Sequence, residues 1–190
     1  TLEDELYTLL GWLDLEPGEP ILLLGCGRGQ LALMIARACP DSAIVACDDG
    51  LSELMIARAL LDEQGIDSVT LVHCSLEHPP LRSDSFSAAL HFGLLHTLPD
   101  EQAHMSNLAT IVRPDGRLVG ISLAQSTLPH IAQAQASQNH SGLRFIAMEP
   151  LAKGMMTMGW TRFRHQQASN WMASFVATRS SQPWQPQPLR

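Results

Sequence analysis

The segment Ile21–Gln30, ILLLGCGRGQ, limits the folds open to this chain more than any other feature. Its apolar residues lead directly into three glycines with the spacing G-x-G-x-G. An apolar run that ends at glycines is typical of a buried parallel strand, followed by a tight turn and a helix. Gly25, Gly27 and Gly29 lack a Cβ, so a ligand can lie against their backbone. The amides that open the next helix would face negative charge on that ligand. The segment therefore predicts a nucleotide-type cofactor site.

Strand and helix patterns alternate through the first two thirds of the chain. A helix is predicted over Leu2–Leu13, and Arg113–Gly116 is predicted as a turn. The predicted strands are Ile21–Leu24, Ala43–Cys47, Val69–Cys74, Phe86–Phe92 and Arg117–Leu123, and the other helices are Gln30–Ala38, Leu51–Gln64 and Pro99–Val112. This alternation predicts a parallel sheet with helices on both faces.

The last third of the chain has a different pattern. Gln125–Gly142 is polar, and it is predicted to be a surface loop or a lid over a substrate, with a short helix at Ile131–Ala136. Glu149–Met158 predicts a helix. Trp160–His165 and Trp171–Thr178 predict two strands that pair as an antiparallel hairpin.

Composition excludes several classes of protein. The chain has 190 residues, the size of one domain, and a formal net charge of −7 without a basic stripe, which argues against nucleic-acid binding. No apolar run approaches the roughly 20 residues that span a bilayer, so no membrane association is expected. The four cysteines show no paired spacing, which predicts a reduced, cytoplasmic protein.

The glycine spacing separates two kinds of cofactor site. A dinucleotide fingerprint, G-x-G-x-x-G, has its third glycine where this chain has Gln30. The motif instead resembles the first motif of class I S-adenosylmethionine (SAM) methyltransferases. Val69–Asp100 and Leu108–Ser122 resemble the middle of the small-molecule members of this family, and the terminal MGWTRF and SFVATR resemble its closing hairpin.

The resemblance covers about Leu6 to Arg179, and it implies the fold. That fold is α/β: a seven-stranded, mostly parallel sheet with helices on both faces and a C-terminal antiparallel β-hairpin. One SAM-dependent methyltransferase domain is expected over residues 1–179. The remaining residues, 180–190, are rich in Pro and Gln and are predicted to form a disordered tail.

The same resemblance implies where SAM would bind, across the C-terminal ends of the first four strands. The glycine loop would lie beneath the methionine part, and the acid that ends the second strand would accept hydrogen bonds from the ribose. Residues after the third strand would bind adenine, and the end of the fourth strand would meet the methionine end. The implied set is Gly25, Cys26, Gly27, Gly29, Asp48, Asp49, Ser75, Leu76 and His91.

Two histidines are candidates for a catalytic base, because imidazole titrates near neutral pH. His96 falls where the family's substrate pocket lies, and His91 is the second candidate; a structural role at a helix end is the other interpretation of His96. Cys26, Cys47 and Cys74 end adjacent strands and could in principle bind a metal. They are predicted to be small buried residues instead, so no metal site is expected.

Three departures from the family pattern leave the activity open. Leu23 replaces an acid, Ser75 replaces an aspartate, and Ser87 replaces another aspartate. The first hypothesis is a methyltransferase for a small organic acceptor, at O, C or N. The second is a degenerate, non-catalytic member that acts as a binding or partner subunit, and a nicotinamide dehydrogenase is third. Either a homodimer or a partner protein is compatible with the sequence.

Overall fold

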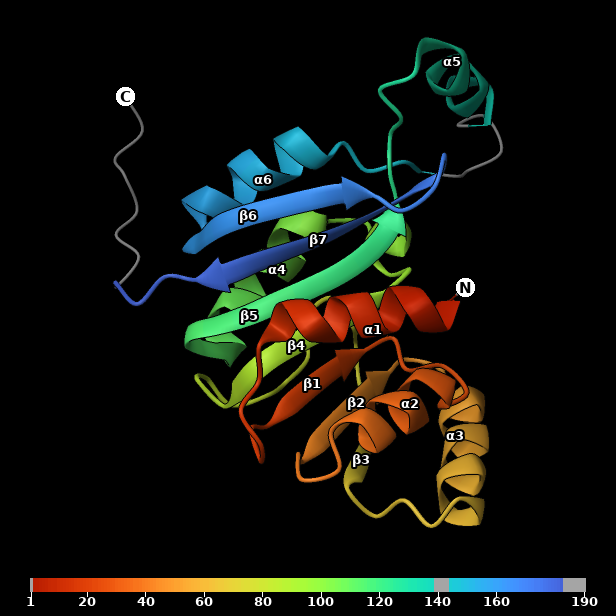
Figure 1. Ribbon diagram of the computed structural model, residues 1–190, viewed down its shortest axis with the longest axis vertical. Helices are drawn as coiled ribbons and strands as arrows, with labels where there is room; N and C mark the ends of the chain where they lie inside the picture. Colours follow the sequence, from red (N-terminus) through yellow and green to blue (C-terminus); the bar gives the residue numbers. More distant parts are fainter. Residues whose placement is uncertain (1, 139–143, 183–190) are drawn as a thin grey trace.

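A computed structural model describes residues 2–138 and 144–182 of the chain. Its centre is a seven-stranded sheet with the order β3-β2-β1-β4-β5-β7-β6 (Figure 1). The strands are β1 (Ile21–Leu24), β2 (Ile44–Asp48), β3 (Val69–His73), β4 (Phe86–Phe92), β5 (Val112–Leu123), β6 (Trp160–Gln167) and β7 (Met172–Arg179). Pairs among the first five strands are parallel, whereas β7 runs antiparallel to both β5 and β6. The fold class predicted from the sequence is confirmed.

Helices cover both faces of this sheet. One apolar cluster contains residues of α1 (Leu2–Leu13), α2 (Gln30–Ala38) and α3 (Leu51–Glu63), and a second contains residues of α4 (Glu101–Ile111) and α6 (Met148–Thr157). The alternation along β1 divides it between the two clusters, since Leu22 and Leu24 enter one and Ile21 and Leu23 the other. Among the described residues, no helix combines the length and apolarity that a membrane span requires.

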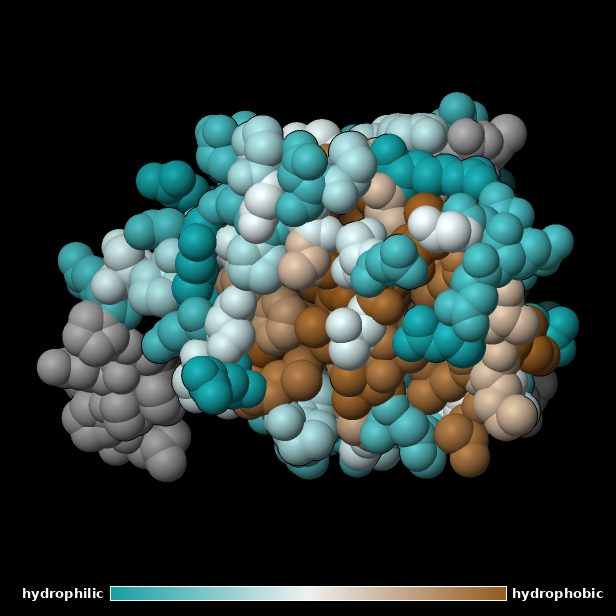
Figure 2. Space-filling model, turned by 90° about the horizontal axis from the view of Figure 1, so that it is seen from below, coloured by the Kyte–Doolittle hydropathy of each residue, from teal (hydrophilic) through white to brown (hydrophobic). Residues whose placement is uncertain are grey.

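The connection from β3 to β4 has no helix, although all of its residues are described. Parallel strands are usually covered on both faces. Val45 and Val72 therefore stay half-buried on this face. On α3, which packs against the opposite face, Leu51, Met55 and Ile56 are exposed. Figure 2 shows apolar side chains gathered on this lower face, where β3 forms the edge of the sheet.

Two segments differ from the sequence prediction. β5 begins at Val112 rather than Arg117, because Val112 already pairs with Phe86. The predicted turn, Arg113–Gly116, lies inside this strand as an excursion whose residues do not pair with β4. Asp115 within it has a left-handed conformation (φ 63°). α5 (Pro129–Gln138) is longer than the expected short helix. Residues 139–143 of the predicted lid, and 183–190 of the predicted tail, lie outside the described residues.

The strand order also locates a crevice. The chain winds outward from β1 to β3 in one direction and from β4 onward in the other, so the order reverses between β1 and β4. Ligands of open α/β sheets bind outside the C-terminal ends of the strands at such a reversal. The loops after β1, β2, β3 and β4 all meet at that edge (Figure 1).

Candidate functional site

The loop after β1 leaves open space above two of its glycines. Gly25 and Gly27 have φ angles of 73° and 52°, a region that L side chains rarely adopt. Apart from Gly27 itself and its two neighbours in the chain, no atom lies within 4 Å of the position that a Cβ on Gly27 would take. For Gly25 the nearest atom is Cδ1 of Leu94, at 3.9 Å. The backbone at these two glycines is therefore open to a ligand.

Gly29 has a different role. A Cβ on this residue would lie 2.9 Å from both Cα and Cβ of Ala57 in α3. The third glycine thus permits the close approach of α2 and α3, rather than the approach of a ligand. This finding corrects the expectation that all three glycines make room for the cofactor.

Asp48, the last residue of β2, braces the glycine loop. Its side chain accepts a hydrogen bond from the backbone N–H of Gly27 at Oδ2 (2.7 Å) and from that of Gly50 at Oδ1 (2.9 Å). The residue is only 8% exposed. A carboxylate has about four acceptor positions, so it can accept further hydrogen bonds from a ligand. Asp49, by contrast, is exposed.

A cavity of about 430 Å³ opens beside this loop. It is lined by Asp49, Ser75, Leu76 and Glu77 on one side, and by Leu94, Thr97, Leu98 and Pro99 on the other. Three residues predicted from the sequence thus meet here, and Leu94 connects the cavity to Gly25. Glu77 was not predicted. It brings a carboxylate to the same cavity as Ser75, which lacks the charge of the family's aspartate.

His91 lies in β4 with its ring completely buried. The ring packs against Phe175 and His104, with centroids 5.2 and 5.9 Å away. Neither ring nitrogen has a hydrogen-bond partner within the described part of the chain. Burial lowers its pKa well below the usual value, and His104 lowers it further. A ring shielded from any substrate argues against the catalytic role predicted for His91. Its backbone pairs with Leu24, at the start of the glycine loop.

His96 is the better placed histidine. It lies in the short 3-10 helix η1 (Leu95–Thr97), is half-buried, and has its Nδ1 3.4 Å from the hydroxyl oxygen of Ser122. Burial lowers the pKa of His96, and the nearby Arg144 lowers it further. The guanidinium of Arg144 pairs with the carboxylate of Glu101. The imidazole is therefore neutral at pH 7 and can accept a proton. No sequence motif indicates Ser122 or Arg144 as its neighbours.

The departures from the family pattern are visible in the packing. Leu23 is 1% exposed inside the apolar layer that α1, α2 and α3 cover, so this position offers no polar group. Ser87 is buried, and its hydroxyl has no partner among the described residues.

Of the three cysteines at strand ends, Cys26 and Cys47 are buried as predicted, whereas Cys74 is half-buried. All four are free, and burial raises the pKa of Cys26 to about 12. Cys47 is fully buried, and burial raises the pKa of its thiol as well. Both side chains are therefore neutral thiols rather than thiolates at pH 7. In the described ranges, no three His, Cys, Asp or Glu side chains are grouped so as to hold a metal ion.

Comparison with known proteins agrees with this geometry. The family model described as "Methyltransferase domain" matches residues 21–116, which run from β1 into the excursion of β5. The chain belongs to this methyltransferase family. It is 32% identical over 114 residues to the ubiquinone/menaquinone biosynthesis C-methyltransferase UbiE of Syntrophotalea carbinolica, covering 59% of this chain and 47% of that enzyme. The chain spans about half the length of the curated relatives that it matches.

Solved structures show the same fold. The YcgJ protein of Bacillus subtilis is similar with a TM-score of 0.81 and 13% identity, over 94% of this chain and 99% of that one. Phosphoethanolamine N-methyltransferase 2 of Haemonchus contortus, in complex with SAM, is similar with a TM-score of 0.79 and 13% identity, over 94% of this chain and 53% of that one. At this identity the likeness establishes the fold alone.

Proposed function

We propose that this chain is a SAM-dependent methyltransferase that transfers a methyl group to a small organic acceptor, at an O, C or N atom. The proposal depends on one observation: the carboxylate of Asp48 accepts a hydrogen bond from the N–H of Gly27, directly beside the open space over the glycine loop. The methyltransferase names of the relatives support the same activity. The proposed domain comprises residues 1–179, and the free cysteines favour a cytoplasmic location.

The residues at this edge of the sheet fit the cofactor. Gly25, Cys26 and Gly27 would lie beneath the methionine part, and Asp48 has acceptor positions left for the ribose hydroxyls. The cavity beside Asp49, Ser75 and Leu76 would take the adenine. When bound, SAM supplies an electrophilic methyl group on a sulfonium. The fit is supported by the open space over Gly25 and Gly27, here called the cradle, and by the buried carboxylate of Asp48 beside it.

The chain's own contribution to the reaction is to position the acceptor and to accept its proton. Holding two reactants in line supplies much of the rate of such a displacement. A base is needed only where the acceptor atom carries a proton. His96 is the proposed base, since its imidazole is neutral at pH 7 and half-exposed at the C-terminal edge of the sheet. Ser122, 3.4 Å from Nδ1, would orient the ring and leave Nε2 for the proton.

A second function is favoured by one observation. Leu23 and Ser75 stand where the family has two acids that bind its cofactor. Leu23 is also buried in an apolar layer. Losing one charge-assisted hydrogen bond costs about 1.5–3 kcal/mol. A non-catalytic subunit, binding a partner protein or a second copy of itself, would tolerate such losses. Glu77, which lines the cavity, favours the active enzyme because it restores one carboxylate.

Calorimetric titration with SAM, S-adenosylhomocysteine and NAD tests the proposal. We expect saturable binding of the first two ligands and none of NAD. The matched variants are Gly27→Ala and Gly65→Ala. Both glycines have positive φ and an open Cβ position, so both substitutions strain the backbone equally, but only the first fills the cradle. We expect Gly27→Ala to weaken SAM binding by about tenfold or more, about 1.4 kcal/mol.

Two results would contradict the proposal. Absence of SAM binding to the folded wild-type chain would favour the non-catalytic subunit. Equal affinity in Gly27→Ala and Gly65→Ala would remove the glycine loop from the site, even if SAM binds elsewhere.

A further inference from the structure

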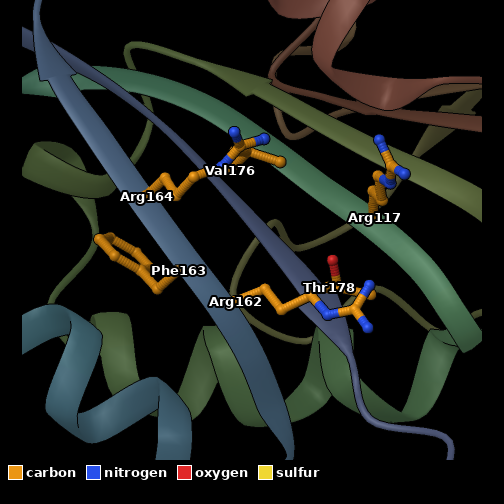
Figure 3. Close-up of a pocket in the computed structure, with 6 residues that line it drawn as sticks. All are labelled: Arg117, Arg162, Phe163, Arg164, Val176 and Thr178. Carbon is orange, nitrogen blue, oxygen red and sulfur yellow. The ribbon is translucent and has the colours of Figure 1, made fainter.

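A second cavity lies far from the candidate cofactor site. It measures about 350 Å³ and is lined by Arg117 of β5, by Arg162, Phe163 and Arg164 of β6, and by Val176 and Thr178 of β7 (Figure 3). Arg117 and Arg162 lie toward the N-terminal ends of β5 and β6, whereas the cofactor site lies at the C-terminal ends of β1 to β4. The cavity therefore opens where the parallel strands begin, opposite the end of the sheet that holds the cofactor site.

A β-bulge brings two of the arginines to one face. Pairing between β6 and β7 shifts between Thr161 and Arg164, so an extra residue enters β6. Phe163 turns to the side of α6 and stacks on Phe175, with centroids 5.6 Å apart. Figure 3 shows Arg162 and Arg164 extending from β6 over β7, toward Thr178 and Val176. Bulges often re-aim side chains in this way at functional sites.

The backbone of this bulge is strained. Arg162 has a φ angle of 52°, in the left-handed region that favours glycine. A side chain other than Gly, Asn or Asp is uncommon there, and residues held in such conformations cluster at ligand-binding sites. Glycine would be less strained than arginine at this position.

Two of the three arginines at this cavity have no partner within the described ranges that neutralises their charge. Arg117 is paired with Asp14 (2.9 Å) and donates to the carbonyl of Trp12 (2.8 Å). The side chains of Arg162 and Arg164 make no ion pair or hydrogen bond with the described residues, and no carboxylate is among the lining residues. The whole chain carries a formal net charge of −7. Three guanidinium groups around one hollow are thus a local exception in an acidic protein.

We propose that this cavity binds a small anion that carries phosphoryl groups. Guanidinium groups match the oxygens of phosphate with paired N–H donors and keep their charge at every physiological pH. A polyvalent anion would offset the repulsion among the three arginines, and the hydroxyl of Thr178 supplies one more donor. The volume suits a small molecule rather than a protein segment. The proposal does not depend on the methyltransferase activity.

Titration of the full chain with sodium pyrophosphate, at constant ionic strength, tests this site. The pocket variant is Arg162→Gln with Arg164→Gln. The matched control is Arg58→Gln with Arg82→Gln, which removes the same charge from exposed arginines elsewhere. We expect one saturable site in the wild type, at least a tenfold loss of affinity in the pocket variant, and little change in the control. Thermal denaturation checks that both variants are folded. If the pocket variant is not folded, the single variant Arg164→Gln is used in its place.

Three outcomes would overturn the proposal. The first is the absence of saturable pyrophosphate binding to the wild type. The second is an equal loss of affinity in the pocket and control variants, which would indicate a general charge effect. The third is tighter binding of citrate than of pyrophosphate, which would identify a carboxylate ligand instead.

Discussion

Asp48 combines two functions in one side chain, and a substitution can test both. Its carboxylate accepts N–H groups from Gly27 and Gly50 on separate oxygens. Asp48→Asn places an amide N–H against one of these donors, so the glycine loop loses a charge-assisted bond. We expect a loss of about 1.5–3 kcal/mol in the free energy of unfolding. If the carboxylate also binds the ribose, SAM affinity falls at least about tenfold. Denaturant unfolding and calorimetry measure the two effects separately.

Asp49→Asn is the control for this residue, because it makes the same charge change one position away on an exposed side chain. We expect its stability to stay close to that of the wild type, and its SAM affinity to change less than that of Asp48→Asn. The reverse order of affinities would assign the ribose to Asp49 and leave Asp48 with a purely structural role.

Packing of α2 against α3 depends on Gly29. The glycine has a φ angle of 90°, and a Cβ there would lie 2.9 Å from the backbone of Ala57. Gly29→Ala should cost about 1–2 kcal/mol for the left-handed backbone and a further ~1–3 kcal/mol for overpacking. Gly65→Ala shares the backbone cost but meets open space. We therefore expect the first variant to lose clearly more unfolding free energy in a denaturant titration. Equal losses would mean that the helices separate without cost.

The sequence was most informative where local pattern and tertiary structure agree. The apolar run before Gly25 forms β1 and Asp48 ends the adjacent β2, so they predict both the sheet and its crevice. The long-range features could not be predicted in this way. The bulge at Arg162 depends on pairing with β7, and the burial of His91 depends on Phe175 and on His104 of α4. The excursion at Asp115 lies between Val112 and Arg117, which both pair with β4.

Taken over the whole molecule, charge is distributed unevenly between surface and interior. The net charge is −7, and the arginine-lined cavity lies at one edge of the sheet. The interior holds His91 and His104, both 0% exposed and without a hydrogen bond of good geometry in the described part of the chain. Burial lowers the pKa of His104 to about 4, although the backbone of Leu76 and Glu77 acts in the opposite direction.

These buried histidines make stability depend on pH in a predictable direction. In the unfolded chain a histidine titrates near 6.5, so between that pH and about 4 the unfolded state binds more protons than the folded state. The contribution of these histidines to the free energy of unfolding is therefore fully present above pH 6.5 and is lost as the pH falls toward 4. For His104 the lowered pKa corresponds to about 3 kcal/mol, and His91 adds to the same trend.

His104→Leu should flatten this dependence, whatever its stability at pH 7, because a side chain that cannot be protonated contributes no slope. Urea unfolding at pH 7, 6, 5 and 4 measures the slope in the wild type, in His104→Leu and in His165→Leu. His165 is exposed on β6, so this control makes the same substitution without removing a buried imidazole. A wild-type slope retained in His104→Leu would mean that the acid sensitivity comes from other groups, with His91 the next to test.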